Sequence, residues 1–141
     1  MREAVIVSYA RTGLAKSGRG GFNITPPMSM AAHAIKHAVE RAGVDKDYVE
    51  DSYIGNCAHG APNIGRQAAL LAGLPKSTAG VSVNRFCSSG LQTIAMAANS
   101  IRSDGSSRVP ITVTIGSAAL RSAWRQITSH SETPLARAVR T

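Results

Sequence analysis

Apolar residues along this chain fall into short runs with the spacing of strands and longer runs with the spacing of helices. Four short, mainly apolar runs predict β-strands, because each is bounded by polar or turn-forming residues. In the first run Val5, Ile6 and Val7 are consecutive, which is typical of a strand buried on both faces. The predicted strands are residues 4–9, 52–56, 79–83 and 109–115.

Between these runs, apolar residues recur every three or four positions, as in helices with a buried face. The predicted helices are residues 28–42, 64–72 and 91–101, with a single helical turn at residues 45–48. Thr25 is predicted to cap the first helix, Gly43 to end it, and Asn63 to cap the second. The third helix carries so little charge that we expect it to be buried on most sides. Strands that alternate with helices predict an α/β fold, in which helices cover both faces of a parallel or mixed sheet.

The composition fits one soluble globular domain, with 141 residues of which 43% are hydrophobic and 17% charged. No apolar run approaches the roughly 20 residues of a membrane span, and the first residues lack the pattern of a secretory signal. Two cysteines give no disulfide framework, so we expect a reducing, cytoplasmic location. The net charge of +8 is scattered and aromatic residues are only 4%, which argues against nucleic acid and favours a polyanionic substrate.

The candidate chemistry centres on Cys87, which follows the predicted strand at residues 79–83 and precedes the predicted helix at residues 91–101. The first N–H groups of a helix point outward, and together with the helix dipole they favour a thiolate over a thiol. The three residues after Cys87 are small, so a substrate carbonyl can approach the sulfur closely. Cys87 is therefore a candidate acyl-accepting nucleophile. A lone cysteine is more commonly a small buried hydrophobic residue, and the residues alone leave both interpretations open.

Other candidate sites are better explained as structural features. His33 and His37 have the i, i+4 spacing of a metal-binding pair, but no Glu or Cys completes the site, so we expect solvated histidines. The Gly-rich residues 16–22 lack the Gly-Lys-Ser/Thr ending of a phosphate loop. Cys57 is interpreted as a buried thiol at a strand end and His59 as a loop histidine. The sequence therefore predicts no metal site.

Several segments resemble the thiolase family, the acyl-CoA C-acyltransferases, and occur in the family's order. They are Asn84-Arg85-Phe86-Cys87-Ser88-Ser89-Gly90-Leu91-Gln92; Ile54-Gly55-Asn56 with Asn63, Arg66-Gln67-Ala68-Ala69-Leu70 and Ala72-Gly73-Leu74-Pro75; and Arg11-Thr12 after the first strand, followed by Gly13 in place of the usual Pro. The resemblance covers residues 2–113. It implies a layered α/β/α N-terminal half that is incomplete here, with a mixed sheet and a central buried helix after the nucleophile strand.

The same resemblance implies the chemistry. Cys87 would take an acyl group from 3-ketoacyl-CoA or acetyl-CoA as a thioester and pass it to coenzyme A or to the enolate of acetyl-CoA. Coenzyme A thioesters are then the substrates, no further cofactor is needed, and the expected role is in fatty acid metabolism.

Beyond Val113 the resemblance stops, so we divide the chain into a partial thiolase domain at residues 1–116 and a tail at residues 117–141. Within the tail, residues 117–127 have helical spacing. The family's second catalytic cysteine, its Gly-His-Pro histidine and its Asn- or His-Glu motif are not found in this sequence. We therefore expect little or no activity from the isolated chain. We hypothesise a truncation or frameshift near residues 113–116, which the other two reading frames would test.

Two alternatives stay open. One is a non-enzymatic fragment that forms a homodimer or pairs with a full-length relative, because thiolases dimerise near the cysteine strand. The other is a relative of the ketoacyl synthases, which share the fold and the cysteine nucleophile, although residues 84–90 have the thiolase form. Fast iodoacetamide labelling of Cys87 without turnover favours the fragment, whereas turnover that is lost in Cys87→Ala favours the enzyme.

Overall fold

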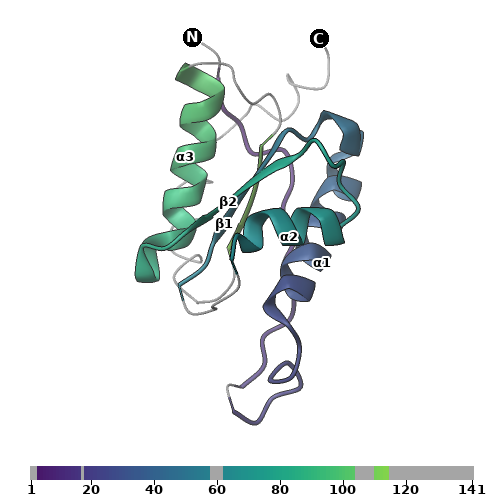
Figure 1. The fold of residues 1–141 in the computed structure, drawn as a ribbon, viewed down its shortest axis with the longest axis vertical. Coiled ribbons are helices and arrows are strands. Elements are labelled where there is room, and N and C mark those ends of the chain that lie inside the picture. Colours follow the sequence, from purple (N-terminus) through teal and green to yellow (C-terminus); the bar gives the residue numbers. More distant parts are fainter. Residues whose placement is uncertain (1–2, 17, 58–61, 104–109, 115–141) are drawn as a thin grey trace.

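The computed structural model describes residues 3–16, 18–57, 62–103 and 110–114. Its centre is a three-stranded sheet in the order β2-β1-β3, and both strand pairs are parallel. The strands are β1 (Asp51–Gly55), β2 (Ala79–Val83) and β3 (Pro110–Thr114). Parallel neighbours need a crossover connection, and helices α2 (Ile64–Leu71) and α3 (Ser89–Ser103) lie in the two crossovers (Figure 1). The α/β class predicted from the alternating pattern is confirmed.

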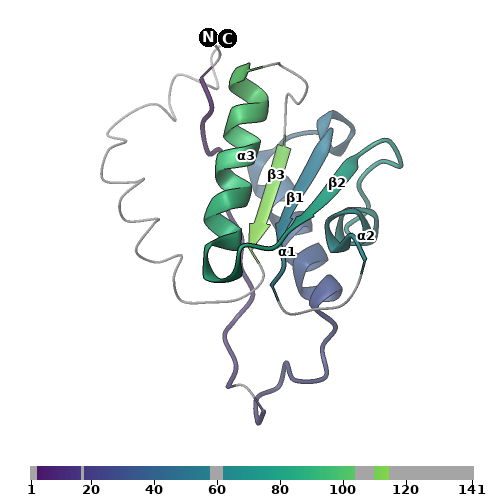
Figure 2. The same cartoon turned by 60° about the vertical axis from the view of Figure 1, so that its left-hand side comes forward.

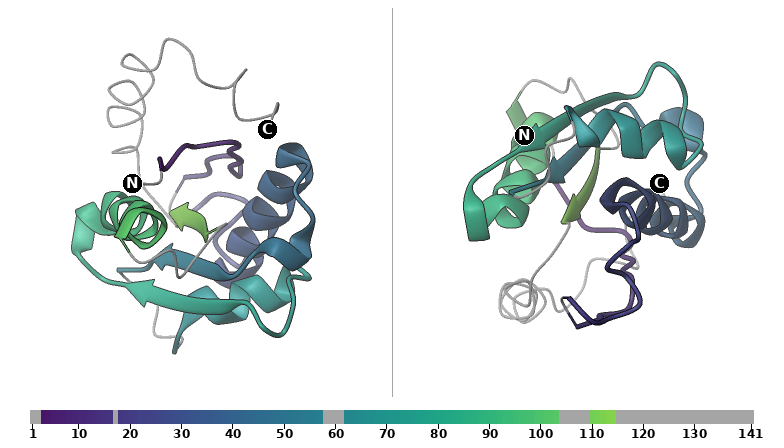
Figure 3. Two further views of the ribbon diagram at one scale, coloured as in Figure 1. Left: turned by 90° about the horizontal axis from the view of Figure 1, so that it is seen from above. Right: turned by 60° about the horizontal axis from the view of Figure 1, so that its bottom comes forward.

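Helices cover both faces of the sheet. Helix α3 packs on one face, against β1 and β3, whereas α1 (Pro27–Ala42) and α2 pack against each other on the opposite face (Figures 2 and 3). The core lies between α1, α2 and β1. Its buried members are Ala31, Ala34, Ile35, Val49, Ile54, Ile64, Ala68, Ala69 and Leu74. None of the helices in the described ranges is both long and apolar enough to span a bilayer.

Local signals set most element boundaries. Gly43 ends α1 in the left-handed conformation at φ 64°, as predicted. Asn63 caps α2 by accepting a hydrogen bond from the N–H of Arg66, and the helical turn predicted at residues 45–48 is the 3-10 helix η1 (Lys46–Tyr48). The prediction for Thr25 is wrong, because Pro26 occupies the N-cap and no side chain caps the helix. Pro27 in the first turn lacks an N–H and so removes one donor that a cap would satisfy.

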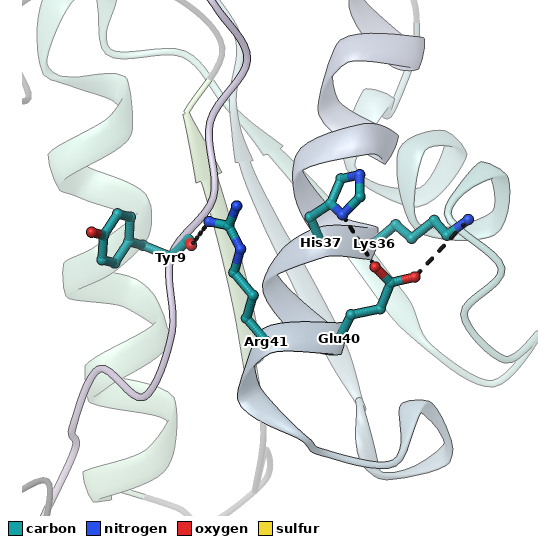
Figure 4. Close-up of polar contacts among 5 residues, drawn as sticks. All are labelled: Tyr9, Lys36, His37, Glu40 and Arg41. Carbon is teal, nitrogen blue, oxygen red and sulfur yellow. Dashed lines mark hydrogen bonds and ion pairs between the residues drawn. The ribbon is translucent and has the colours of Figure 1, made fainter.

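The strand predicted at residues 4–9 is wrong. This segment pairs with none of the three described strands, and the side chains of Val5 and Val7 are 43% and 51% exposed. A strand needs a hydrogen-bonding neighbour, and β-prone residues alone do not supply one. The segment is held instead by a side chain, since Nη1 of Arg41 on α1 donates to the carbonyl of Tyr9 at 3.0 Å (Figure 4).

Helix α3 is buried on one face, which corrects the expectation that it is buried on most sides. Its buried residues are Ser89, Gly90, Thr93 and Ala97, whereas the side chain of Leu91 is 52% exposed. Because these buried residues are small, α3 can pack closely against the sheet through the face that carries them. The strand predicted at residues 109–115 is β3, while the helix predicted at residues 117–127 lies outside the described residues.

Candidate active site

Cys87 lies in the turn between β2 and α3, where the sequence placed it. Strand β2 ends at Val83, a short 3-10 helix η2 (Phe86–Ser88) carries the cysteine, and α3 begins at Ser89. The thiol is free and exposed. Cys87 precedes the first turn of the 15-residue helix α3, at the end of the helix where the dipole is positive. The interpretation of Cys87 as a buried hydrophobic residue is therefore excluded.

Side-chain hydrogen bonds define the shape of this turn. Phe86 has φ 45°, the left-handed region that a bulky residue rarely adopts. Its N–H donates to Oδ1 of Asn84 at 3.0 Å. The hydroxyl of Ser89 accepts from the N–H of Arg85 at 2.9 Å and donates to the carbonyl of Phe86 at 2.7 Å. These contacts join the residues on both sides of Cys87.

The guanidinium of Arg85 donates to Oε1 of Gln92 on the second turn of α3. This contact holds a positive charge beside the first turns of the helix that follows Cys87. A cation there adds to the positive potential of the helix start, which favours a negatively charged group in front of it.

The end of β1 supports the cysteine turn from the side. A Cβ on Gly55 would lie 2.9 Å from the carbonyl carbon of Ser89, so the strand and the helix start are in direct contact. The N–H of Asn56 donates to the carbonyl of Val83 at 2.9 Å and continues the ladder to the end of β2. The segment Ile54-Gly55-Asn56 therefore lies directly beside the segment that carries Cys87.

Cys57 is exposed, so its predicted burial is wrong. It lies beyond the last paired residue of β1, in a bend. His59 lies outside the described residues. The two cysteines therefore both follow parallel neighbouring strands and are both accessible, which makes Cys57 an internal reference for the reactivity of Cys87.

Helix α2 fixes β2 from the other face. A Cβ on Gly80 would lie 2.6 Å from Cα of Arg66, and a Cβ on Gly65 would lie 2.9 Å from the amide nitrogen of Val81. Nδ2 of Asn63 donates to the carbonyl of Gly80 at 2.8 Å. Sequence reasoning missed this crossing, although a glycine inside a strand pattern is a signal of close backbone approach.

The remaining candidates do not form a second site around Cys87. The ring centroids of His33 and His37 are 4.3 Å apart. Nδ1 of His37 lies 3.1 Å from Oε2 of Glu40, three residues further along α1 (Figure 4). The sequence analysis did not consider this carboxylate as a neighbour of the histidines. Within the described ranges, no group of three or more His, Cys, Asp or Glu side chains is arranged to hold a metal. Lys36 approaches the same carboxylate at 4.0 Å.

The Gly-rich loop closes on itself. The N–H of Gly20 donates to the carbonyl of Lys16, and the N–H of Gly18 donates to Oδ1 of Asn23. Amides that are bonded within the loop do not cradle a phosphate. A groove of about 310 Å³ lies between α1 and α2 and does not include Cys87. Its lining residues are Ser29, Ala32, His33, Lys36, Leu71 and Ala72.

The fold and the turn define a class: an α/β domain that presents an exposed cysteine between a parallel strand and a helix start. Residues 4–133 match the family described as "Thiolase, N-terminal domain", and the chain belongs to the thiolase family. The match continues past Val113, where the recognisable motifs end.

Named relatives agree with this assignment. The chain is 41% identical over 104 residues to the 3-ketoacyl-CoA thiolase of Bacillus subtilis, covering 72% of this chain and 27% of the relative. It is 40% identical over 105 residues to the human mitochondrial acetyl-CoA acetyltransferase, covering 72% and 24%. The crystal structure of the Bacillus anthracis acetyl-CoA acetyltransferase superposes with a TM-score of 0.77 at 33% identity, covering 81% of this chain and 29% of that one. The chain therefore spans about a quarter of the length of these relatives.

Proposed function

We propose that this chain is the acyl-accepting part of an acyl-CoA C-acyltransferase, with Cys87 as the nucleophile. The observation that carries the proposal is the exposed thiol of Cys87 at the start of α3, within a segment that matches the thiolase family. The relatives are named for acetyl-CoA acetyl transfer or 3-ketoacyl-CoA thiolysis. Coenzyme A thioesters are thus the proposed substrates.

In the proposed reaction the thiolate of Cys87 attacks the carbonyl carbon of an acyl-CoA thioester. A bond forms between that carbon and the sulfur of Cys87, the bond to the sulfur of coenzyme A breaks, and coenzyme A leaves as a thiolate that takes up a proton. In condensation the acyl group then passes to the enolate of acetyl-CoA. In thiolysis the sulfur of Cys87 instead attacks the 3-keto carbon of a 3-ketoacyl-CoA, the bond between C2 and C3 breaks, acetyl-CoA leaves as an enolate that takes up a proton, and the acyl group passes to coenzyme A. N–H groups at a helix start stabilise the negative charge that develops on the thioester oxygen, and the backbone N–H of Cys87 is the proposed donor.

We expect the isolated chain to be acylated slowly and to show little or no turnover. No cysteine follows Cys87 in this sequence, and the thiolase resemblance assigns removal of the α-proton to a second cysteine. A nucleophile without its base and its full set of oxyanion donors loses orders of magnitude in rate.

The test is incubation of the chain with acetyl-CoA, followed by intact-mass and peptide mapping, beside an assay for coenzyme A-dependent cleavage of acetoacetyl-CoA. The expected result is one acetyl group on Cys87, lost in Cys87→Ala and retained in the control Cys57→Ala, with little or no cleavage. An acetyl group on neither cysteine, or on both at equal rates, would contradict the proposed role.

A second candidate is pairing of this chain with itself or with a full-length relative. Strand β2 lies at an edge of the described sheet, and an edge strand can pair with another strand, although the carbonyl of Gly80 already accepts from Nδ2 of Asn63. Light scattering of the chain, alone and mixed with a full-length relative, measures such pairing. A monomeric mass for the chain alone, and a mixture that shows only the separate masses of the chain and of the relative, would argue against it.

A further inference from the structure

We infer that Ser89 is a positioning residue, whose hydroxyl holds the turn that carries Cys87. The inference rests on the proposed function only in so far as it takes Cys87 to be the nucleophile. Ser89 is almost fully buried, with only 4% of the residue exposed. Its hydroxyl contacts backbone groups of Arg85 and Phe86, and we assign it no contact with substrate.

The hydroxyl of Ser89 has two partners, both on residues that precede Cys87. It accepts from the N–H of Arg85 at 2.9 Å and donates to the carbonyl of Phe86 at 2.7 Å. The backbone N–H of Ser89 donates to the same carbonyl of Phe86. Ser89 therefore holds the peptide group between Asn84 and Arg85 and the peptide group between Phe86 and Cys87.

These bonds are needed because Phe86 is strained. A bulky residue rarely adopts φ 45° and keeps this conformation only when its surroundings hold it. Packing does not hold Phe86, since its side chain is 77% exposed. The hydrogen bonds to Asn84 and Ser89 remain: the side chains of both residues bond to the backbone of Phe86, and the backbone N–H of Ser89 donates to the same carbonyl as its hydroxyl. If one is lost, Phe86 relaxes and the next residue, Cys87, moves with it.

Ser89 is itself held by the sheet. A Cβ on Gly55 would lie 2.9 Å from the carbonyl carbon and 3.1 Å from the Cβ of Ser89, so the end of β1 lies directly against it. The described contacts thus run from Gly55 through Ser89 to Phe86, and from there along the backbone to Cys87. The rigid sheet, rather than the loop alone, sets the position of the sulfur.

The test is the rate of iodoacetamide alkylation of Cys87 divided by the rate for Cys57 in the same molecule, measured on the full chain. Removal of one buried hydrogen bond in Ser89→Ala is expected to lower this ratio by roughly threefold to tenfold, because the sulfur leaves the helix start. The control is Thr78→Val, which removes a buried hydroxyl that donates to the carbonyl of Val49 at 2.7 Å, at the other end of β2. It is expected to lower stability but to leave the ratio unchanged.

A ratio that is unchanged or higher in Ser89→Ala, or that falls equally in Thr78→Val, overturns the inference. Amide hydrogen exchange gives a readout without any substitution, since the N–H of Arg85 is expected to be protected through its bond to Ser89. Free exchange of that amide in the wild-type chain also overturns it. Alkylation needs no acyl-CoA, so failure of acetyl transfer to Cys87 would refute the proposed function and leave this result standing.

Discussion

Single glycines decide how closely α2 and β2 approach each other. Gly65 on α2 and Gly80 on β2 lie where the two elements cross. A side chain on Gly65 would overlap the backbone of β2, and a side chain on Gly80 would overlap the backbone of α2. Strand β2, which leads to Cys87, therefore packs against α2 on one face and pairs with β1 along one edge. The position of the cysteine turn thus depends on residues that have no side chain.

Gly80→Ala is expected to destabilise the chain by about 1–3 kcal/mol, because the added methyl group overlaps the backbone of Arg66 and forces α2 outward. Urea unfolding followed by circular dichroism measures the change. Gly21→Ala is the matched control, since nothing lies within 4 Å of its added Cβ, and its unfolding midpoint should stay within error. Equal midpoints for both variants would show that the crossing is not tight.

Buried hydroxyls give a second prediction at the residue scale. Ser52 is 0% exposed, and within the described part of the chain its hydroxyl has no hydrogen-bond partner. An unsatisfied buried polar group costs about 1–3 kcal/mol, so Ser52→Ala is expected to raise the free energy of unfolding by about 1 kcal/mol. Thr78→Val removes a hydroxyl that is bonded, and should lower it. A loss of stability in Ser52→Ala would reveal a partner for this hydroxyl.

At the scale of elements, Asn63 joins the start of α2 to β2. Its Oδ1 accepts from the N–H of Arg66, its Nδ2 donates to the carbonyl of Gly80, and its backbone is left-handed at φ 40°. Asn63→Ala removes both bonds and places a Cβ in a strained conformation, so we expect a loss of about 2 kcal/mol. Asn63→Gly loses the bonds but tolerates the conformation, and should be less destabilised. Thermal unfolding compares the two, and equal melting temperatures would exclude a contribution from backbone conformation.

The elements that the sequence predicts correctly are those with local signals. Gly43 and Asn63 mark helix ends by their own chemistry, so α1 and α2 follow from the pattern. The failures are non-local. Residues 4–9 have strand composition but no neighbour to pair with among the described strands, and the buried face of α3 depends on its contact with Gly55, which periodicity along one helix does not reveal.

The candidate site likewise has one part that the sequence predicts and another that it does not. The position of Cys87 between strand and helix is visible in the sequence, because the strand, the small residues and the helix are consecutive. The role of Ser89 is not visible, since its hydroxyl bonds depend on the left-handed backbone of Phe86, and a phenylalanine gives no sign of that conformation. A local pattern predicts where the proposed nucleophile lies, whereas the structure is needed to show what holds it.

At the scale of the whole molecule, much apolar surface is in contact with solvent. Large hydrophobic side chains that are exposed in the described ranges are Val5, Ile6, Val7, Tyr9, Leu14, Phe22, Ile24, Tyr48, Leu70, Leu71, Phe86 and Leu91. The chain also spans only about a quarter of the length of its relatives, and β2 lies at a sheet edge. Exposed apolar patches and open strand edges promote association, so we expect the chain to self-associate as its concentration rises.

The N-terminal segment is the part of this surface that can be changed without loss of the core. Val5→Lys with Val7→Lys is expected to lower the average mass measured by light scattering at high concentration, because the charges oppose pairing of a β-prone, exposed run. The unfolding midpoint should not change, since neither side chain is buried. Gly21→Lys with Asn99→Lys adds the same charge at exposed positions elsewhere and serves as the control. If the control lowers the mass equally, net charge rather than residues 5–7 governs association, and these residues have no special part in it.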